Sequence, residues 1–469
     1  MAAGASTPLE LGKLMLKLRR RRFISTCASG VAAVLTGAAW APLASTADSN
    51  NSIEDEARSP TRFDARSGDE LQRALDELSA KGGGVLSLAK VRELTCVDRE
   101  ARIAEETSRH ALLVPEGVEL DLGGSTLLLE MRSNSYGVRL SSRSAIRNGS
   151  IKIIRSEGKG SQAIWHSAVS VGAAYDDAGT VAKPGVFSSV GRWCIENLTI
   201  DQPFEAACIQ LMSEAHHGEI RNIRILDSPN ALLGVGLDWG TLGPVRTADE
   251  LVPRMRELWE KNEIASTHPH HVRIENITVG KFGRSMDGND AAIRCAGCHH
   301  ITIRNIDVAS AMSAVALFGG DFGFEFAPEN ERREAHGGYL VENIRIKEAR
   351  LYGIVMNGAE DNVYRSKRDF GYVPLRDPVH PGLDKPIIRN AVLRGTGVPG
   401  SRGVYLAAAS GASFENLDIE GFEIGFAVNE WVGDSQVSNC RIAQNKVNIQ
   451  RRNDAQAKES VLFRNIADD

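Results

Sequence analysis

The sequence predicts an all-β solenoid, in which the chain winds into stacked coils of short parallel strands. Three observations predict this fold class. A motif of the form apolar-x-Asn-apolar-x-apolar recurs through most of the chain. Each copy is followed by a second short segment with period-two alternation, which is typical of a strand with one buried face. Glycine, at 45 of 469 residues, is too abundant for a helix-rich protein.

The repeat is the strongest of these signals, because internal periodicity of this length is typical of solenoids. Its asparagine lies between two apolar half-segments, and neighbouring copies such as Asn197 and Asn222 are 25 residues apart. A turn asparagine tolerates the left-handed conformation and bonds the local backbone. The repeated asparagines are Asn148, Asn197, Asn222, Asn276, Asn305, Asn343, Asn390, Asn416 and Asn439.

The N-terminal segment, residues 1–47, has the features of an export signal. Arg20–Arg22 precede an apolar run of small residues, Val31–Ala44, and Ser45–Ala47 offer a cleavage site. The pattern resembles a twin-arginine signal peptide, which implies the twin-arginine export machinery as a partner of the precursor and a periplasmic or extracellular location. The alternative, a membrane anchor, is disfavoured because a bilayer span needs about 20 apolar residues. Residues 48–65 are expected to form a polar linker.

A single helix is expected at the start of the solenoid. Ser67 and Glu70 form a capping box, Leu71 and Leu75 continue at helical spacing, and Gly82–Gly84 end the helix before a strand. Such a helix closes the otherwise open end of the coil. We expect the solenoid domain over residues 66–455 and a C-terminal tail over 456–469.

The asparagine repeat and the N-terminal helix resemble those of the pectate-lyase-like superfamily. That resemblance implies a right-handed parallel β-helix whose stacked asparagines form a ladder. The superfamily includes lyases, hydrolases, epimerases, tailspikes and surface proteins, so the resemblance implies a fold and no single activity.

Charge restricts the partners. The formal net charge is −5, and removal of residues 1–47 leaves 49 basic and 59 acidic residues, a net charge near −10. No basic cluster of the kind that nucleic-acid binding requires occurs in that part of the chain. We therefore expect neither a nucleic-acid partner nor membrane association of the mature chain.

Insertions between repeats predict a cleft. Asn222 and Asn276 are 54 residues apart, and the next long spacings, ending at Asn343 and Asn390, are 38 and 47 residues. All three insertions follow the second strand segment, so they leave the stack at one edge. Loops grouped on one edge are a common way to build a binding cleft on a repeat scaffold.

Acidic residues near this edge suggest catalysis on a poly- or oligosaccharide. Carboxylates on adjacent coils lie roughly 5 Å apart and those two coils apart about 10 Å, a range that covers the carboxylate separations of glycoside hydrolases. We therefore predict an exported carbohydrate-active enzyme that cleaves glycosidic bonds with paired carboxylates. The candidate catalytic residues are Asp238, Asp287, Asp290, Arg294 and Asp321, and the candidate substrate-binding residues are Trp239, His271, Glu325, Asn357 and Tyr405.

Two alternatives remain open. A polysaccharide lyase would use a base and a cation against a uronate, with Ca²⁺ held by Asp238, Asp287 and Asp290. A non-catalytic glycan-binding protein could use the same cleft. Outside the lyase alternative we expect no cofactor and assign no metal ligands: we interpret the histidines around His271 as a loop-exit cluster, and the Cys295-Ala-Gly-Cys298-His299 pattern is discounted as a haem site because Cys295 aligns with core positions.

Overall fold

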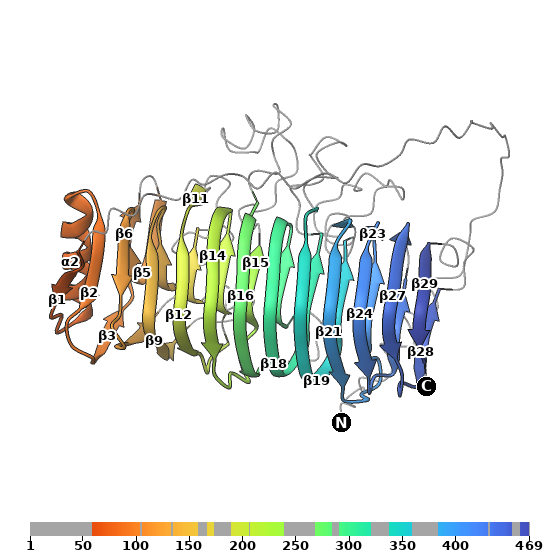
Figure 1. Cartoon of the computed structure of the whole chain (residues 1–469). Coiled ribbons are helices and arrows are strands. Elements are labelled where there is room, and N and C mark those ends of the chain that lie inside the picture. Colours follow the sequence, from red (N-terminus) through yellow and green to blue (C-terminus); the bar gives the residue numbers. More distant parts are fainter. Residues whose placement is uncertain are drawn as a thin grey trace, which may run out of the picture. The chain divides into compact units, whose positions relative to one another are not determined.

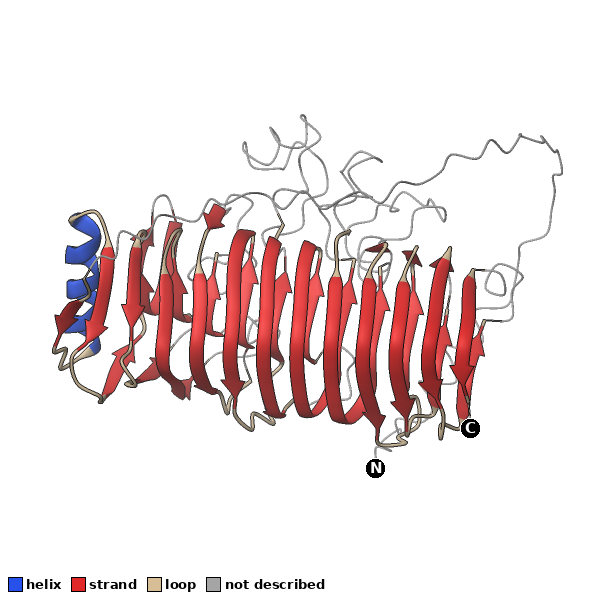
Figure 2. Ribbon diagram, in the orientation of Figure 1, coloured by secondary structure: helices blue, strands red, loops and turns tan. Residues whose placement is uncertain are grey.

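The computed structural model describes residues 59–103, 106–132, 135–157, 167–172, 189–205, 207–238, 268–283, 290–319, 337–358, 383–429, 432–452 and 460–468. Across them, 26 strands belong to one sheet, and nearly all pairings are parallel. Successive coils lie side by side from the helix α2 to strand β29 (Figure 1). The described part of the chain contains one helix, and the rest of its regular structure is strand (Figure 2). The fold is the predicted right-handed parallel β-helix.

Each full coil has three strand segments, which stack into three columns. The first two segments flank the repeated asparagine and form one continuous strand in most coils. These strands are β9 (Ala145–Ser156), β12 (Cys194–Asp201), β14 (Glu214–Ile225), β16 (His270–Lys281), the first part of β18 (His299–Phe318), the first part of β19 (Leu340–Asn357), β21 (Ile387–Gly395), β24 (Ser413–Glu420), β27 (Ser435–Ile442) and β29 (Val461–Ala467).

The third column contains the separate alternating segment of each coil. Its members are β5 (Glu106–Val114), β8 (Tyr136–Leu140), β10 (Ser167–Val171), β13 (Ala207–Met212), β15 (Leu233–Asp238), β17 (Ala291–Ala296), the last parts of β18 and β19, β22 (Arg402–Ala407), β25 (Ile424–Val428) and β28 (Val447–Arg451). The first coils are completed by β1 (Thr61–Phe63), β2 (Gly84–Leu88), β3 (Glu93–Val97), β4 (Arg99–Ile103), β6 (Val118–Asp121) and β7 (Thr126–Met131), and short pairings at the corners add β11 (Ser189–Gly191), β20 (Leu383–Asp384), β23 (Ala409–Ser410) and β26 (Val432–Gly433).

The register of strand pairing stacks similar apolar side chains on one another in the core. Ile220 pairs with Ile274, which pairs with Ile303, and all three side chains are fully buried. In the third column Leu237 pairs with Cys295, which pairs with Leu317. Burial raises the pKa of the Cys295 thiol to about 12, so this cysteine is a core residue, as its alignment predicts.

The predicted asparagine ladder is present. The repeated asparagines have φ between 52° and 59°. From Asn197 to Asn416, each side-chain amide donates to the side-chain oxygen of the asparagine one coil before it, whereas Asn148 donates to Asp121. Asn276 donates to Asn222 and Asn305 donates to Asn276, both at 2.9 Å. The ladder is solvent-exposed, however, because the asparagines turn outward at the corner. Its side-chain hydrogen bonds therefore compete with water, and the left-handed backbone is the stronger constraint.

A second constant turn precedes each of these asparagines by five residues. The residues at this position also have positive φ, between 40° and 73°, and we call them the corner residues. They lie where the third segment of one coil leads into the first segment of the next, which we call the third corner. The corner residues are Arg143, Arg192, His217, His271, His300, Gly338, Lys385, Gly411 and Asp434.

The capping helix is confirmed as α2 (Gly68–Ala80). The Ser67 hydroxyl accepts from the Glu70 amide at 3.2 Å, and Glu70 accepts from the amide of Arg66, one residue before the expected capping-box partner. Leu71 and Leu75 are fully buried against the first coil. The helix thus covers core that the first coil would expose.

The structure extends the domain at both ends. Strand β1 lies inside the predicted linker and pairs with β2, and β29 lies inside the predicted tail and pairs with β27. β29 contains a further, looser copy of the repeat, since Asn465 has φ 52° and donates to Asn439. These two segments are too short for their sequence pattern to predict strands. Pairing with a neighbouring strand stabilises them.

The three long insertions start at one corner, as predicted. They begin after β15, β18 and β19, each at the end of a third-column strand, and they end at a first-column strand. The helix expected near Thr247 lies outside the described residues. Among the described residues, no helix has the length and apolarity that crossing a membrane requires.

The asparagine ladder can be tested at Asn305, which donates to Asn276 and accepts from Asn343. Asn305→Ala should lower the free energy of unfolding by about 1–3 kcal/mol, because alanine loses both hydrogen bonds and is strained at φ 56°. Asn305→Gly is the matched control: it loses the same bonds without the strain, so it should cost less. Equal denaturant midpoints for both variants and the wild type would contradict the role of this turn.

A buried histidine makes stability pH-dependent. His110 in β5 is 1% exposed, and burial, together with the charges of Arg139 and Arg99, lowers its pKa to about 3. Below pH 6.5 the unfolded chain binds a proton that the native side chain does not, so stability falls as the pH falls.

Between pH 7.5 and pH 4.5 this one residue should remove about 2–3 kcal/mol of stability. Denaturant titrations across that range should show a shallower pH dependence for His110→Gln than for the wild type. Parallel pH profiles would show that His110 has the same pKa in the native and the unfolded state.

Candidate functional site

The outward face of the third column contains most of the predicted site residues that the structure describes. Alternation in β15 and β17 buries Leu237 and Cys295 in the core and turns Asp238 and Arg294 outward. Small residues separate the functional side chains, since Gly236 pairs with Arg294 and Asp238 pairs with Ala296. On this face of the third column, glycine and alanine therefore lie beside the charged side chains and leave room for them.

Asp238 and Arg294 form an ion pair on adjacent coils. Arg294 Nη1 lies 3.6 Å from Asp238 Oδ2, and the two side chains are only 10% and 5% exposed. The guanidinium also lies 5.5 Å from the ring centre of Phe318, on the following coil. Charges this well buried are costly to remove from water, and their mutual attraction offsets part of that cost.

The face continues over two more coils. Phe318 pairs with Asn357, which is 7% exposed, and Tyr405 lies one coil beyond. The Asn429 amide donates to the Tyr405 hydroxyl, and Arg402 stacks 5.2 Å from the Tyr405 ring centre. We call Asp238, Arg294, Phe318, Asn357 and Tyr405 the outer-face patch.

Asp290 does not belong to this patch. It precedes β17, whereas Asp238 ends β15 and is level with Ala296, six residues further along the strand. At about 3.3 Å per residue the two levels are up to roughly 20 Å apart. Asp290 instead interacts electrostatically with Arg350, whose guanidinium donates to the carbonyl oxygen of Phe282 at 2.7 Å. Asp238 and Asp290 are thus too far apart to share a Ca²⁺ ion or act as an acid pair.

Four predicted site residues lie outside the described residues: Trp239, Asp287, Asp321 and Glu325. The catalytic roles of Asp287 and Asp321 therefore stay predictions. Of the predicted catalytic residues, the structure brings together Asp238 and Arg294. Of the predicted substrate-binding residues, it places Asn357 and Tyr405 on the same face.

His271 lies apart from the strand face, at the third corner. There it is one of six histidines, whose grouping the sequence did not predict. The others are His216, His217, His270, His299 and His300. A signal was available, because each histidine pair ends five residues before a repeated asparagine. Phe318 was also missed, since it matters only through its contact with Arg294.

Comparison with known proteins adds fold-level similarity. No protein-family model and no curated protein matches the chain. Among solved structures, the A-module of mannuronan C-5 epimerase AlgE6 from Azotobacter vinelandii is 13% identical, with a TM-score of 0.48 over 86% of this chain and 95% of that chain. An exopolygalacturonase from Thermotoga maritima is 13% identical, with a TM-score of 0.43 over 87% and 91%.

The tailspike protein of E. coli bacteriophage HK620 is 10% identical, with a TM-score of 0.46 over 86% of this chain and 75% of that chain. At such identities a resemblance concerns the fold alone, so function has to be argued from the residues of this chain. By its strand topology, the described part of the chain is a right-handed parallel β-helix.

Proposed function

We propose that the protein binds a poly- or oligosaccharide along the outer face of its third column and cleaves its glycosidic bonds. The observation that carries this proposal is the buried Asp238–Arg294 ion pair beside Phe318. The pair joins a group that can act as base or nucleophile to a cation and an aromatic ring, which are the components that sugar binding and cleavage use.

The spacing of the patch suits a polymer. Its five residues come from five successive coils, and neighbouring coils are about 4.8 Å apart. That rise is comparable to the length of one pyranose unit, so a glycan lying parallel to the stack would meet a new side chain at each sugar. Asp238, Asn357 and Tyr405 supply hydrogen-bonding groups, and Phe318 supplies an apolar surface for a sugar face.

For hydrolysis, Asp238 would act as the ionised carboxylate, because the adjacent guanidinium favours a negative charge there. A second carboxylic acid is needed to protonate the leaving group. Asp321 and Glu325 remain the candidates for that role, since both follow Phe318 closely in the sequence.

Arg294 favours a second candidate function, β-elimination on a uronate-containing glycan. A lyase must neutralise the sugar carboxylate before a proton beside it can be removed. The buried Arg294 offers a cation that can bind the sugar carboxylate. In this case Ca²⁺ would have to be bound by residues other than the pair Asp238 and Asp290.

The two functions predict different effects of Asp238→Asn and Arg294→Lys, tested on panels of neutral and uronate-containing polysaccharides. Under hydrolysis, Asp238→Asn should lower kcat at least 100-fold, new reducing ends should appear without ultraviolet absorbance, and chelators should have little effect. Under elimination, Arg294→Lys should be the more damaging change, because lysine cannot bind a carboxylate in two-point fashion, and the products should absorb as unsaturated sugars.

Asp201→Asn is the matched control, because Asp201 is an outward carboxylate of the second column that pairs with Lys152 at 3.1 Å, away from the patch. It should retain full activity. Tight glycan binding by the wild type with no product of either kind would replace the enzymatic proposal with the glycan-binding alternative.

We also propose that the chain is exported by the twin-arginine route to the periplasm or the cell exterior. Arg20 and Arg21 changed together to lysine should leave the uncleaved precursor in the cytoplasm, because the export machinery requires the arginine pair. Fractionation followed by immunoblotting checks this outcome. Normal amounts of periplasmic, shortened protein from the double variant would remove the twin-arginine assignment.

A further inference from the structure

Six histidines form a double stack at the third corner, on three successive coils. One stack consists of the corner residues, and the other consists of the residues immediately before them. We call the whole set the histidine ladder, and it comprises His216, His217, His270, His271, His299 and His300.

Both stacks are tightly packed. Ring centres of His271 and His300 are 4.6 Å apart with planes 6° from parallel, and those of His270 and His299 are 4.9 Å apart at 15°. Within each coil the two histidines are also in contact: the Nδ1 atoms of His299 and His300 are 2.8 Å apart, as are those of His270 and His271. This short separation requires one Nδ1 of each pair to be protonated and the other to offer its lone pair.

The backbone does not require histidine at these positions. The same corner in other coils is occupied by arginine, glycine, lysine or aspartate at similar positive φ. Glycines instead make room for the ladder at its ends, since a Cβ on Gly191 would lie 2.4 Å from the His216 ring and one on Gly338 would lie 2.8 Å from the His300 ring. Six imidazoles in three consecutive coils therefore need an explanation beyond turn geometry.

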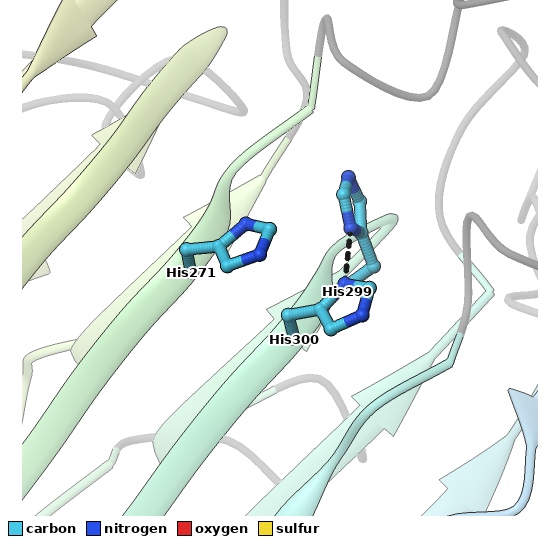
Figure 3. A group of neighbouring side chains, drawn as sticks. All are labelled: His271, His299 and His300. Atoms are coloured by element: carbon cyan, nitrogen blue, oxygen red, sulfur yellow. Dashed lines mark hydrogen bonds between the residues drawn. The ribbon is translucent and has the colours of Figure 1, made fainter. Parts of the chain in front are cut away.

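Three of the six converge as a ligand set. One nitrogen from each of His271, His299 and His300 lies within 4.8 Å of the others, and Figure 3 shows the three rings grouped at the ends of β16 and β18. His299 is 8% exposed, whereas His271 and His300 are exposed. The group is thus anchored on its inner side and accessible from solvent.

The contacts within each pair also leave a ring nitrogen able to bind a metal ion. Two Nδ1 atoms 2.8 Å apart cannot both carry a proton, so one ring of each pair is neutral. A neutral imidazole is the form that coordinates metal ions.

We propose that His271, His299 and His300 bind one divalent transition-metal ion of the zinc class. Zinc–imidazole bonds are about 2.0–2.1 Å long, so the three nitrogens must lie roughly 3.3 Å from one another around the ion. The His271 and His300 rings must therefore tilt out of their parallel stack, so that their in-plane lone pairs meet at one point. Three protein ligands leave a fourth position open for water or for an oxygen of a bound molecule. Imidazole ligands also suit Cu²⁺ and Ni²⁺, whereas Ca²⁺ and Mg²⁺ prefer oxygen. This proposal does not depend on the proposed glycan activity.

The test uses the untagged full-length chain, stripped of metal and titrated calorimetrically with Zn²⁺. We expect one ion per chain, and Co²⁺ in its place should show the visible absorption of a tetrahedral site. His271→Asn and His300→Asn should each weaken Zn²⁺ affinity more than 100-fold, beyond the roughly 10–100-fold cost of losing an outer-shell partner. Asparagine tolerates the positive φ of both positions, so these variants should fold, which circular dichroism can verify.

His217→Asn is the matched control. It makes the same change at a corner residue of the same ladder, with φ 51°, but outside the three-residue set. Its Zn²⁺ affinity should stay close to that of the wild type. Absence of saturable Zn²⁺ binding by the wild type, or an equal loss in all three variants, would overturn the proposal.

Discussion

Backbone pairing between equivalent strands of successive coils is the constraint on which the rest of the structure depends. It fixes the rise per coil at about 4.8 Å and holds the register, so that any residue type repeated at one position becomes a column of contacts. Ile274 meets Ile303 in the core, Asn276 meets Asn305 at one corner and His271 meets His300 at another. One backbone spacing thus suits apolar packing, amide hydrogen bonding and ring stacking.

The same constraint explains how much of the fold could be predicted from sequence. A residue that turns the chain in every coil recurs in the sequence at a regular interval. The asparagines from Asn148 to Asn439 recur in this way. The ends were predicted less well. β29 ends at Ala467 and is followed by Asp468 where the motif has its last apolar residue, and β1 has only three residues. Backbone hydrogen bonds to the neighbouring strand stabilise such segments more than their own apolar residues do.

The site was predictable where strand alternation applied and not where the chain turns. Asp238 and Arg294 both lie inside strands, so period two and register together determine that they meet. Asp290 lies just before a strand, where alternation gives no direction, and the register separates it from Asp238. The grouping of the histidines was not predicted for another reason. No single pair indicates a site, and only the constant distance of each pair from the next asparagine shows that three pairs share one column.

The fixed distance of five residues between corner residue and asparagine has a consequence for how such a chain can diverge. Nine of the described coils share this spacing. An insertion or deletion between the two positions would shift one turn out of register with its neighbours, so only substitutions are tolerated there. Just before the corner residue, the spacing already varies by dozens of residues between coils. A lineage can therefore lengthen or replace its loops, and with them the molecules it selects, while inheriting the scaffold unchanged.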